Sequence, residues 1–175
     1  ARKGGYAPGG EDYRWGILRQ RLRPWQFPVF NFAFISLYQN LIIWLITLPA
    51  LTVFQHPRAL GPLDWVLAAL FLAALAGETA ADQQQWNYQV WKKMQRMAGQ
   101  DTGAGFVQTG LFRYSRHPNF FFEQAQWWLF YGFAVVASGT WLHWTLAGPL
   151  LLTLLFAGST VFTESISAGR YPAYR

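Results

Sequence analysis

The chain has 175 residues and a mass of 20.0 kDa, which suits a single domain. Apolar residues make up 53% of it and aromatic residues 19%, but only 13% are charged, against about 25% in an average soluble domain. So few charged side chains cannot cover a water-exposed globule. The absence of cysteine excludes disulfide scaffolds, thiolate metal sites and cysteine nucleophiles. No pair of histidines has metal-ligand spacing, so we expect no metal.

Long apolar runs dominate the sequence, and a helix that spans a bilayer needs roughly 20 such residues. In chain order they predict membrane helices over 27–54, 63–81, 120–138 and 142–162. The first run has no charged side chain, and Pro49 in its last third predicts a kink. Tryptophans gather near the ends of the runs, as in an interfacial aromatic belt. We predict an all-α integral membrane bundle of about four transmembrane helices; the alternative is a soluble bundle with four buried helices.

The polar segments of this single membrane domain comprise the N-terminal segment 1–26, the loop 82–119 and the C-terminal tail 163–175. Four spans place these segments on one side of the membrane and the short connections 55–62 and 139–141 on the other. Of the 14 lysines and arginines, all except Arg58 lie on the first side, which is a positive-inside pattern. That side is expected to be the cytosol, or the mitochondrial matrix. The membrane is then a bacterial inner membrane or an organelle membrane (endoplasmic reticulum or inner mitochondrial), and the net charge of +6 requires no nucleic acid partner.

The end of the polar loop offers groups that bind anions. Arg113, Arg116, His117 and Asn119 fall within seven residues, directly before the third apolar run. The N-terminus of a helix favours anions, and arginine makes bidentate contacts to phosphate or carboxylate. This pattern predicts a site for a phosphorylated cofactor at the membrane surface. The alternative is a set of ordinary positive-inside arginines beside a capped helix.

Three acidic residues lie inside or at the end of apolar runs, on the side that holds the polar loop 82–119. They are Glu78, Glu123 and Glu164, and Asp82 follows Glu78 by one helical turn. Ionisable residues in membrane segments are rare, and they are usually paired or functional. The acids are therefore either part of a functional site or structural ion pairs that hold the loop in place.

The stretch 110–123 reads GLFRYSRHPNFFFE. It resembles the signature G-L-[WF]-x-x-S-R-H-P-N-Y-x-G-E of the steroid 5α-reductase-like membrane proteins, to which the sterol C14 and C7 reductases are more distantly similar. Three further stretches resemble the family in the same order, and together they cover most of the chain. They are GGEDYRWGILR at 9–19, ADQQQWNYQ at 81–89 and TESISAGRYPAYR at 163–175.

The resemblance implies a helical membrane protein that binds NADPH on the cytosolic side and reduces the carbon–carbon double bond of a lipid enone. The nicotinamide would supply the hydride, and the protein would supply a proton donor. The residues implied to line the cofactor pocket are Asp82, Arg116, His117, Asn119 and Glu123. Those implied to close it from the C-terminal end are Glu164, Arg170, Tyr171 and Tyr174.

The chain departs from the family pattern at several points. Phe122 stands where the family usually has glycine, Phe120 where tyrosine is common, and Gln85 where lysine is usual. The family's upstream helices, which contribute the substrate pocket and a catalytic acid, have no counterpart in this sequence. No catalytic residue is therefore assigned, and the chain is interpreted either as a fragment or as a fold kept for another purpose.

Three functions remain open on the sequence. The first is an NADPH-dependent reductase acting on a lipid-like enone in the membrane. The second is a non-catalytic accessory subunit of a larger membrane complex, held among other membrane subunits. The third is a membrane methyltransferase that uses S-adenosylmethionine, because isoprenylcysteine carboxyl methyltransferases have a similar R-H-P-x-Y block. Asn119 and the pair Tyr171-Pro172 favour the reductase.

Overall fold

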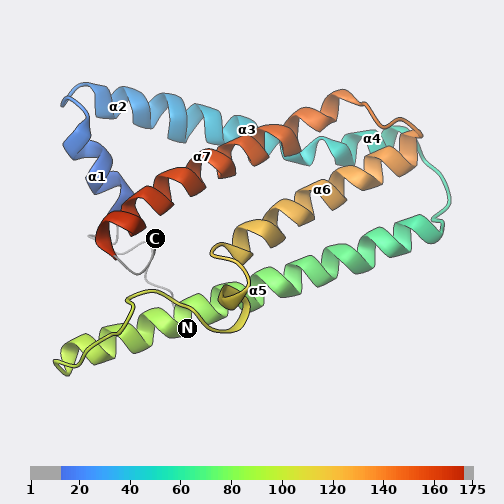
Figure 1. Ribbon diagram of the computed structural model, residues 1–175. Coiled ribbons are helices and arrows are strands. Elements are labelled where there is room, and N and C mark those ends of the chain that lie inside the picture. Colours follow the sequence, from blue (N-terminus) through green and yellow to red (C-terminus); the bar gives the residue numbers. More distant parts are fainter. Residues whose placement is uncertain (1–12, 172–175) are drawn as a thin grey trace. The chain divides into compact units, whose positions relative to one another are not determined.

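The computed structural model describes residues 13–171, and every regular element in that part of the chain is helical (Figure 1). This confirms the predicted all-α class. The chain divides into two compact units, one up to Ile43 and one from Trp44 onward.

The first unit contains short helical segments rather than one regular helix. Its elements are α1 (Tyr13–Arg21), α2 (Gln26–Phe30), a π-helix η1 (Asn31–Tyr38) and the start of α3 (Gln39–Thr47). Rings four residues apart stack along it, with centroids 5.0 Å apart for Phe30 and Phe34 and 5.3 Å apart for Phe34 and Tyr38. Trp15 of α1 contacts Phe30 at 6.3 Å. The predicted polar segment 1–26 thus contains a helix in its described part.

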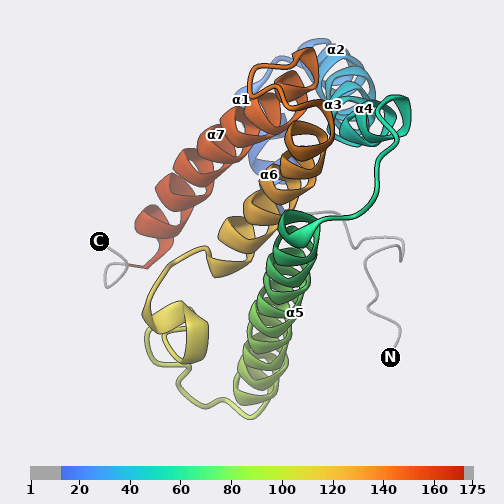
Figure 2. The same ribbon diagram turned by 90° about the vertical axis from the view of Figure 1, so that its right-hand side faces the viewer.

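The second unit is a helical bundle with α6 at its centre. Its elements are the end of α3, α4 (Pro49–Gln55), α5 (Pro62–Met97), a 3₁₀ turn η2 (Gly110–Arg113), α6 (Pro118–Ser138), a 3₁₀ turn η3 (Trp144–Leu146) and α7 (Ala147–Arg170). Helix α6 packs against α4, α5 and α7, and it lies between α5 and α7 in both views (Figure 1 and Figure 2). Contacts between α5 and α6 are the most extensive in the unit.

The kink predicted at Pro49 is present as an interruption between two helical elements. Helix α3 ends at Thr47, and α4 starts with Pro49 in its first turn. Proline has no N–H to continue the hydrogen-bond ladder. Gly148 of α7 packs directly against this break, since a Cβ on it would lie 2.6 Å from the carbonyl oxygen of Leu45. A small residue in α7 therefore lets the two backbones approach closely.

Helix α5 is much longer than predicted. The apolar run 63–81 continues as helix to Met97, so the predicted loop 82–119 is wrong in its first half. The physical reason is that residues 82–97 contain no glycine or proline and are rich in the good helix formers glutamine, lysine, arginine and methionine. The chain leaves the helix only at Gly99, where φ is 67°. The true connection to α6 is the segment 98–117, named the basic loop below.

Among the described residues, three helices are long and apolar enough to cross a membrane: Gln26–Gln55, Pro62–Met97 and Trp144–Arg170. Helix α6, predicted over 120–138, forms over Pro118–Ser138 but is not among the three. Its amides and Glu123 make its N-terminal half more polar than the other spans. The predicted last span, 142–162, is shifted: α7 starts at Ala147 and continues to Arg170, so most of the predicted polar tail is helical.

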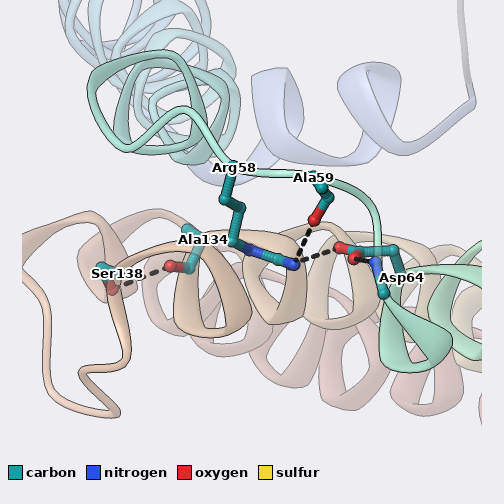
Figure 3. A network of polar contacts seen from close by, with 6 residues as sticks. Arg58, Ala59, Asp64, Ala134 and Ser138 are labelled. Carbon is teal, nitrogen blue, oxygen red and sulfur yellow. Dashed lines mark hydrogen bonds and ion pairs between the residues drawn. The ribbon is translucent and has the colours of Figure 1, made fainter.

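A polar elbow joins α4 to α5 (Figure 3). Asp64, only 6% exposed, accepts a 2.6 Å hydrogen bond from Arg58 and a 2.7 Å bond from the N–H of Gly61. Arg58 also donates to the carbonyl of Ala59. Gly61 is the N-cap of α5, and Asp64, three residues later, accepts from its N–H as in a capping box. The one arginine outside the predicted basic side therefore has a structural partner.

Candidate functional site

The predicted site residues come from three helices and the basic loop, all within the second unit. Helix α5 contributes Asp82, the basic loop Arg116 and His117, and α6 both Asn119 and Glu123. Helix α7 contributes Glu164 and Arg170, and Tyr171 follows directly. Tyr174 lies outside the described residues.

Asp82 and Asn119 meet across the interface of α5 and α6. The side-chain amide of Asn119 donates to the Asp82 carboxylate at 3.3 Å. Asn119 lies in the first turn of α6, because Pro118 occupies the first helical position, where its missing N–H costs nothing. The R-H-P-N motif therefore ends in an amide that is fixed to the neighbouring helix.

Glu164 brings α7 to the basic loop. Its carboxylate lies 3.4 Å from Nε2 of His117 and 3.7 Å from the guanidinium of Arg116. The distance from His117 to Glu164 is that of an ion pair, but the geometry is not that of a hydrogen bond. Nε2 of His117 is therefore buried without a hydrogen-bond partner among the described residues. The imidazole stacks on Phe120 at 5.1 Å. Segments 48 residues apart in sequence thus share one carboxylate at the end of the bundle.

Glu78 and Glu123 lie deeper along the same helices than Asp82 and Asn119. Gln126, 8% exposed, donates its amide to Glu78. Glu123 faces the negative charges of Glu78 and Asp82 on α5. Polar groups in apolar helices usually face protein, because lipid cannot satisfy them. These two acids therefore extend the polar face of the α5–α6 interface from the site toward the apolar part of the bundle.

Phe122, which stands where the steroid 5α-reductase-like signature has glycine, packs at the interface of α5 and α6. Its ring lies against Gly77 of α5, since a Cβ on Gly77 would be 2.6 Å from two ring atoms and 2.8 Å from a third. A large residue on α6 is matched by the absence of a side chain on α5. The ring therefore fills the helix interface, one turn further from the basic loop than Asn119.

Two contacts that the sequence did not reveal hold the basic loop. Gln84 accepts a 2.8 Å hydrogen bond from the N–H of Leu111, in the 3₁₀ turn η2 that precedes the R-H-P-N motif. Gly110 has a φ of 61° and passes so close to Gln84 that a side chain on it would collide. Gln84 belongs to the ADQQQ stretch, but nothing in its spacing showed that it binds the loop.

Lys92 is the second residue that the sequence did not reveal. It donates to the hydroxyl of Tyr171 at 2.8 Å and to the carbonyl of Gly105. The hydrogen bond from Lys92 is the main cause that lowers the pKa of the Tyr171 phenol below its ordinary value. In the sequence Lys92 could not be told apart from the exposed positive-inside residues around it.

These features define a helical membrane protein with a polar cluster where α5, α6 and α7 meet the basic loop. The cluster consists of Asp82, Arg116, His117, Asn119 and Glu164. The chain belongs to the family described as "Protein of unknown function (DUF1295)", whose pattern matches residues 2–175. It is 41% identical over 186 residues to the uncharacterized protein C594.04c of Schizosaccharomyces pombe (strain 972 / ATCC 24843). The match covers 99% of this chain and 54% of that relative, so the chain spans about half of its length. No solved structure matches the chain.

Proposed function

We propose that this chain carries the cofactor-binding part of an NADPH-dependent membrane reductase of the steroid 5α-reductase type, acting on the carbon–carbon double bond of a lipid enone. The observation that carries the proposal is the joining of Asp82 with Asn119 and of Glu164 with Arg116 and His117. These residues are far apart in sequence, and the resemblance implied a cofactor role for each. The DUF1295 family, which is found in steroid 5α-reductase-like proteins, supports the same reading.

The donor set of the cluster fits the chemistry of NADPH, which supplies a hydride when it is bound. Arg116 and Arg170 are exposed guanidinium groups that suit the phosphates. The first turn of α6 has no side-chain cap, so its N–H groups suit an anion as well. His117 Nε2 and the amide of Asn119 are polar atoms of the cluster that suit a nicotinamide amide, which needs hydrogen-bond partners.

The membrane placement is part of the proposal. The ends of α5 and α7 that carry the cluster also carry the basic residues Lys92, Lys93, Arg96 and Arg170. The positive-inside rule then puts the cluster in the cytosol or the matrix, where NADPH is available, and the apolar helices in contact with lipid. A lipid-like substrate would approach from the bilayer. Nucleic acid has no part in this account.

A second candidate, a non-catalytic subunit of a membrane complex, is favoured by one observation. Phe122 replaces the family glycine, and its ring fills the interface against Gly77. If a reductase needs that space for its cofactor, this chain has kept the fold without the reaction. A methyltransferase that binds S-adenosylmethionine is the third candidate, and a binding experiment separates all three.

The test is a titration of NADPH into the chain purified in mild detergent, followed by nicotinamide fluorescence. Asn119→Ala removes the amide at the centre of the cluster, and Asn87→Ala is its matched control on the outer face of α5. A hydrogen bond between neutral groups contributes about 0.5–1.5 kcal/mol, so Asn119→Ala should weaken NADPH binding by about two- to tenfold. Asn87→Ala should change it less than twofold, by the same reasoning.

Saturable NADPH binding that depends on Asn119 would support the reductase. Binding of S-adenosylmethionine in place of NADPH would favour the methyltransferase. If the folded chain binds neither ligand and copurifies with other membrane proteins, the reductase proposal is wrong and the subunit is favoured.

A further inference from the structure

Lys92 is a buried lysine at a place where its neighbours are exposed. It lies on the part of α5 beyond the apolar run and is only 6% exposed, whereas Trp91 and Lys93 on either side are exposed. In the described part of the chain, no carboxylate forms an ion pair with it. Burying an ammonium is costly unless hydrogen bonds compensate. Such a residue is therefore held in place by specific partners.

Those partners join three segments. The Lys92 ammonium donates to the Gly105 carbonyl in the basic loop and, at 2.8 Å, to the Tyr171 hydroxyl at the end of α7. It also lies 4.9 Å from the centre of the Tyr171 ring. The same ring packs so closely on Gly105, where φ is 79°, that a Cβ there would lie 2.8 Å from Cδ1. Phe106 contacts the ring at 6.0 Å.

The basic loop thus touches α7 at two places. One is the Gly105–Tyr171 contact, and the other is the contact of Arg116 and His117 with Glu164. Glu164 and Tyr171 are seven residues apart, which is about 10 Å along a helix. Fixing the end of α7 at Tyr171 therefore limits where the Glu164 carboxylate can lie relative to His117.

We propose that Lys92 is a positioning residue for the candidate cofactor site: by holding Tyr171 and Gly105 together, it keeps the end of α7 on the basic loop and Glu164 beside His117 and Arg116. The choice of NADPH as the ligand rests on the proposed function. The contact of Lys92 with Tyr171 and Gly105 does not depend on it. Lys92 does not touch the reacting atoms in this account. It acts through Tyr171, whose phenol pKa is lowered mainly by the hydrogen bond from Lys92 and further by the charge and hydrogen bond of Arg170.

The experiment compares Lys92→Met with Lys93→Met, which removes the same charge from the next, exposed position. Spin labels on Met97→Cys and Gly169→Cys report the distance between the ends of α5 and α7, and the chain has no other cysteine. Met97 is 79% exposed, and Gly169 has open space for a side chain. Lys92→Met should broaden the distance distribution, while Lys93→Met should leave it as in the wild type. Lys92→Arg, which keeps the donors and the charge, should largely restore it.

Two further readouts complete the test. Absorbance titration at 295 nm, taken as the difference from Tyr171→Phe, should show that the Tyr171 phenol titrates at higher pH in Lys92→Met. The dissociation constant of NADPH should rise about five- to fiftyfold in Lys92→Met and stay within twofold in Lys93→Met.

The outcomes separate the contact from the ligand. If Lys92→Met has the distances and the phenol titration of the wild type, the positioning role is wrong. If the distances and the phenol titration both change but the affinity for NADPH does not, Lys92 holds α7 in place without affecting the cofactor site. The proposal that Lys92 positions that site is then wrong. If the wild type does not bind NADPH, the proposed function is wrong, and so is the proposal that Lys92 positions a cofactor site. The distances between the two spin labels then still show whether Lys92 holds α7 to the basic loop.

Discussion

Gly77 and Phe122 form a matched pair whose coupling can be predicted in sign and in size. In Gly77→Ala, the new Cβ would lie 2.6 Å from two atoms of the Phe122 ring, about 1 Å inside an ordinary contact. Overpacking of this kind costs about 2–3 kcal/mol, and the better helix propensity of alanine offsets about 1 kcal/mol of it. The net expected loss of stability is about 1–2 kcal/mol.

Removing the ring reverses the expected sign. In a Phe122→Ala background the collision is absent, so Gly77→Ala should stabilise the chain by about 1 kcal/mol through helix propensity alone. The difference between the two backgrounds is a coupling energy of about 2–3 kcal/mol. At about 2–4 °C per kcal/mol, the unfolding temperature should fall by several degrees in one background and rise in the other.

The assay is thermal unfolding of the four variants in one detergent, followed by intrinsic fluorescence of the ten tryptophans. Gly158→Ala in α7 is the control for propensity, because nothing lies within 4 Å of a Cβ there. If Gly77→Ala has the same effect in both backgrounds, Phe122 does not fill the space above Gly77. The explanation of how the α5–α6 interface accommodates Phe122, in place of the glycine of the steroid 5α-reductase-like signature, would then be refuted.

Three further predictions follow from other contacts. Gly148→Ala should lower stability by about 2 kcal/mol or more relative to Gly158→Ala, because the new Cβ meets the Leu45 backbone and not a movable side chain; thermal unfolding checks this. Asp64→Ala should lower the unfolding temperature more than Asp64→Asn, which keeps an acceptor for the Gly61 N–H, and equal effects would exclude the capping role. The phenol pKa of Tyr171 is lower in the folded chain than its ordinary value, so ionisation of the phenol raises the free energy of unfolding. This gain in stability is complete above a pH of about 10, the ordinary pKa, and is lost as the pH falls through the folded-state pKa. The stability difference between wild type and Tyr171→Phe should therefore widen from pH 7 to pH of about 10.5, and a constant difference would contradict the contact with Lys92.

The start of α6 was predictable from the sequence because its signals are local. Pro118 fixes the first helical position, and Gly139, with a φ of 70°, ends the helix. The kink at Pro49 follows from the same kind of local chemistry. The end of α5 was not predictable from hydropathy, because the helix continues after the apolar run stops. Helix propensity and the position of Gly99 carried that information instead.

The site could be predicted in part for a related reason. The R-H-P-N stretch and the isolated acids marked Asn119, His117 and Glu164 as unusual, and the structure brings Glu164 to His117. Lys92 was missed because burial decides its role, and burial depends on where α7 ends in space. A lysine on a polar helix surface and a lysine that holds two segments together have the same local sequence.

Amide hydrogen exchange with and without NADPH is the measurement that tests the central claim most directly, because it reports both binding and its location. Saturating NADPH is expected to slow exchange in 110–123 and 163–171, whereas S-adenosylmethionine is expected to leave these segments unchanged. The segment 139–146, at the opposite end of α6, should not respond. Protection confined to other segments, or none at NADPH concentrations that saturate reductases, would contradict the assignment of this cluster as a cofactor site.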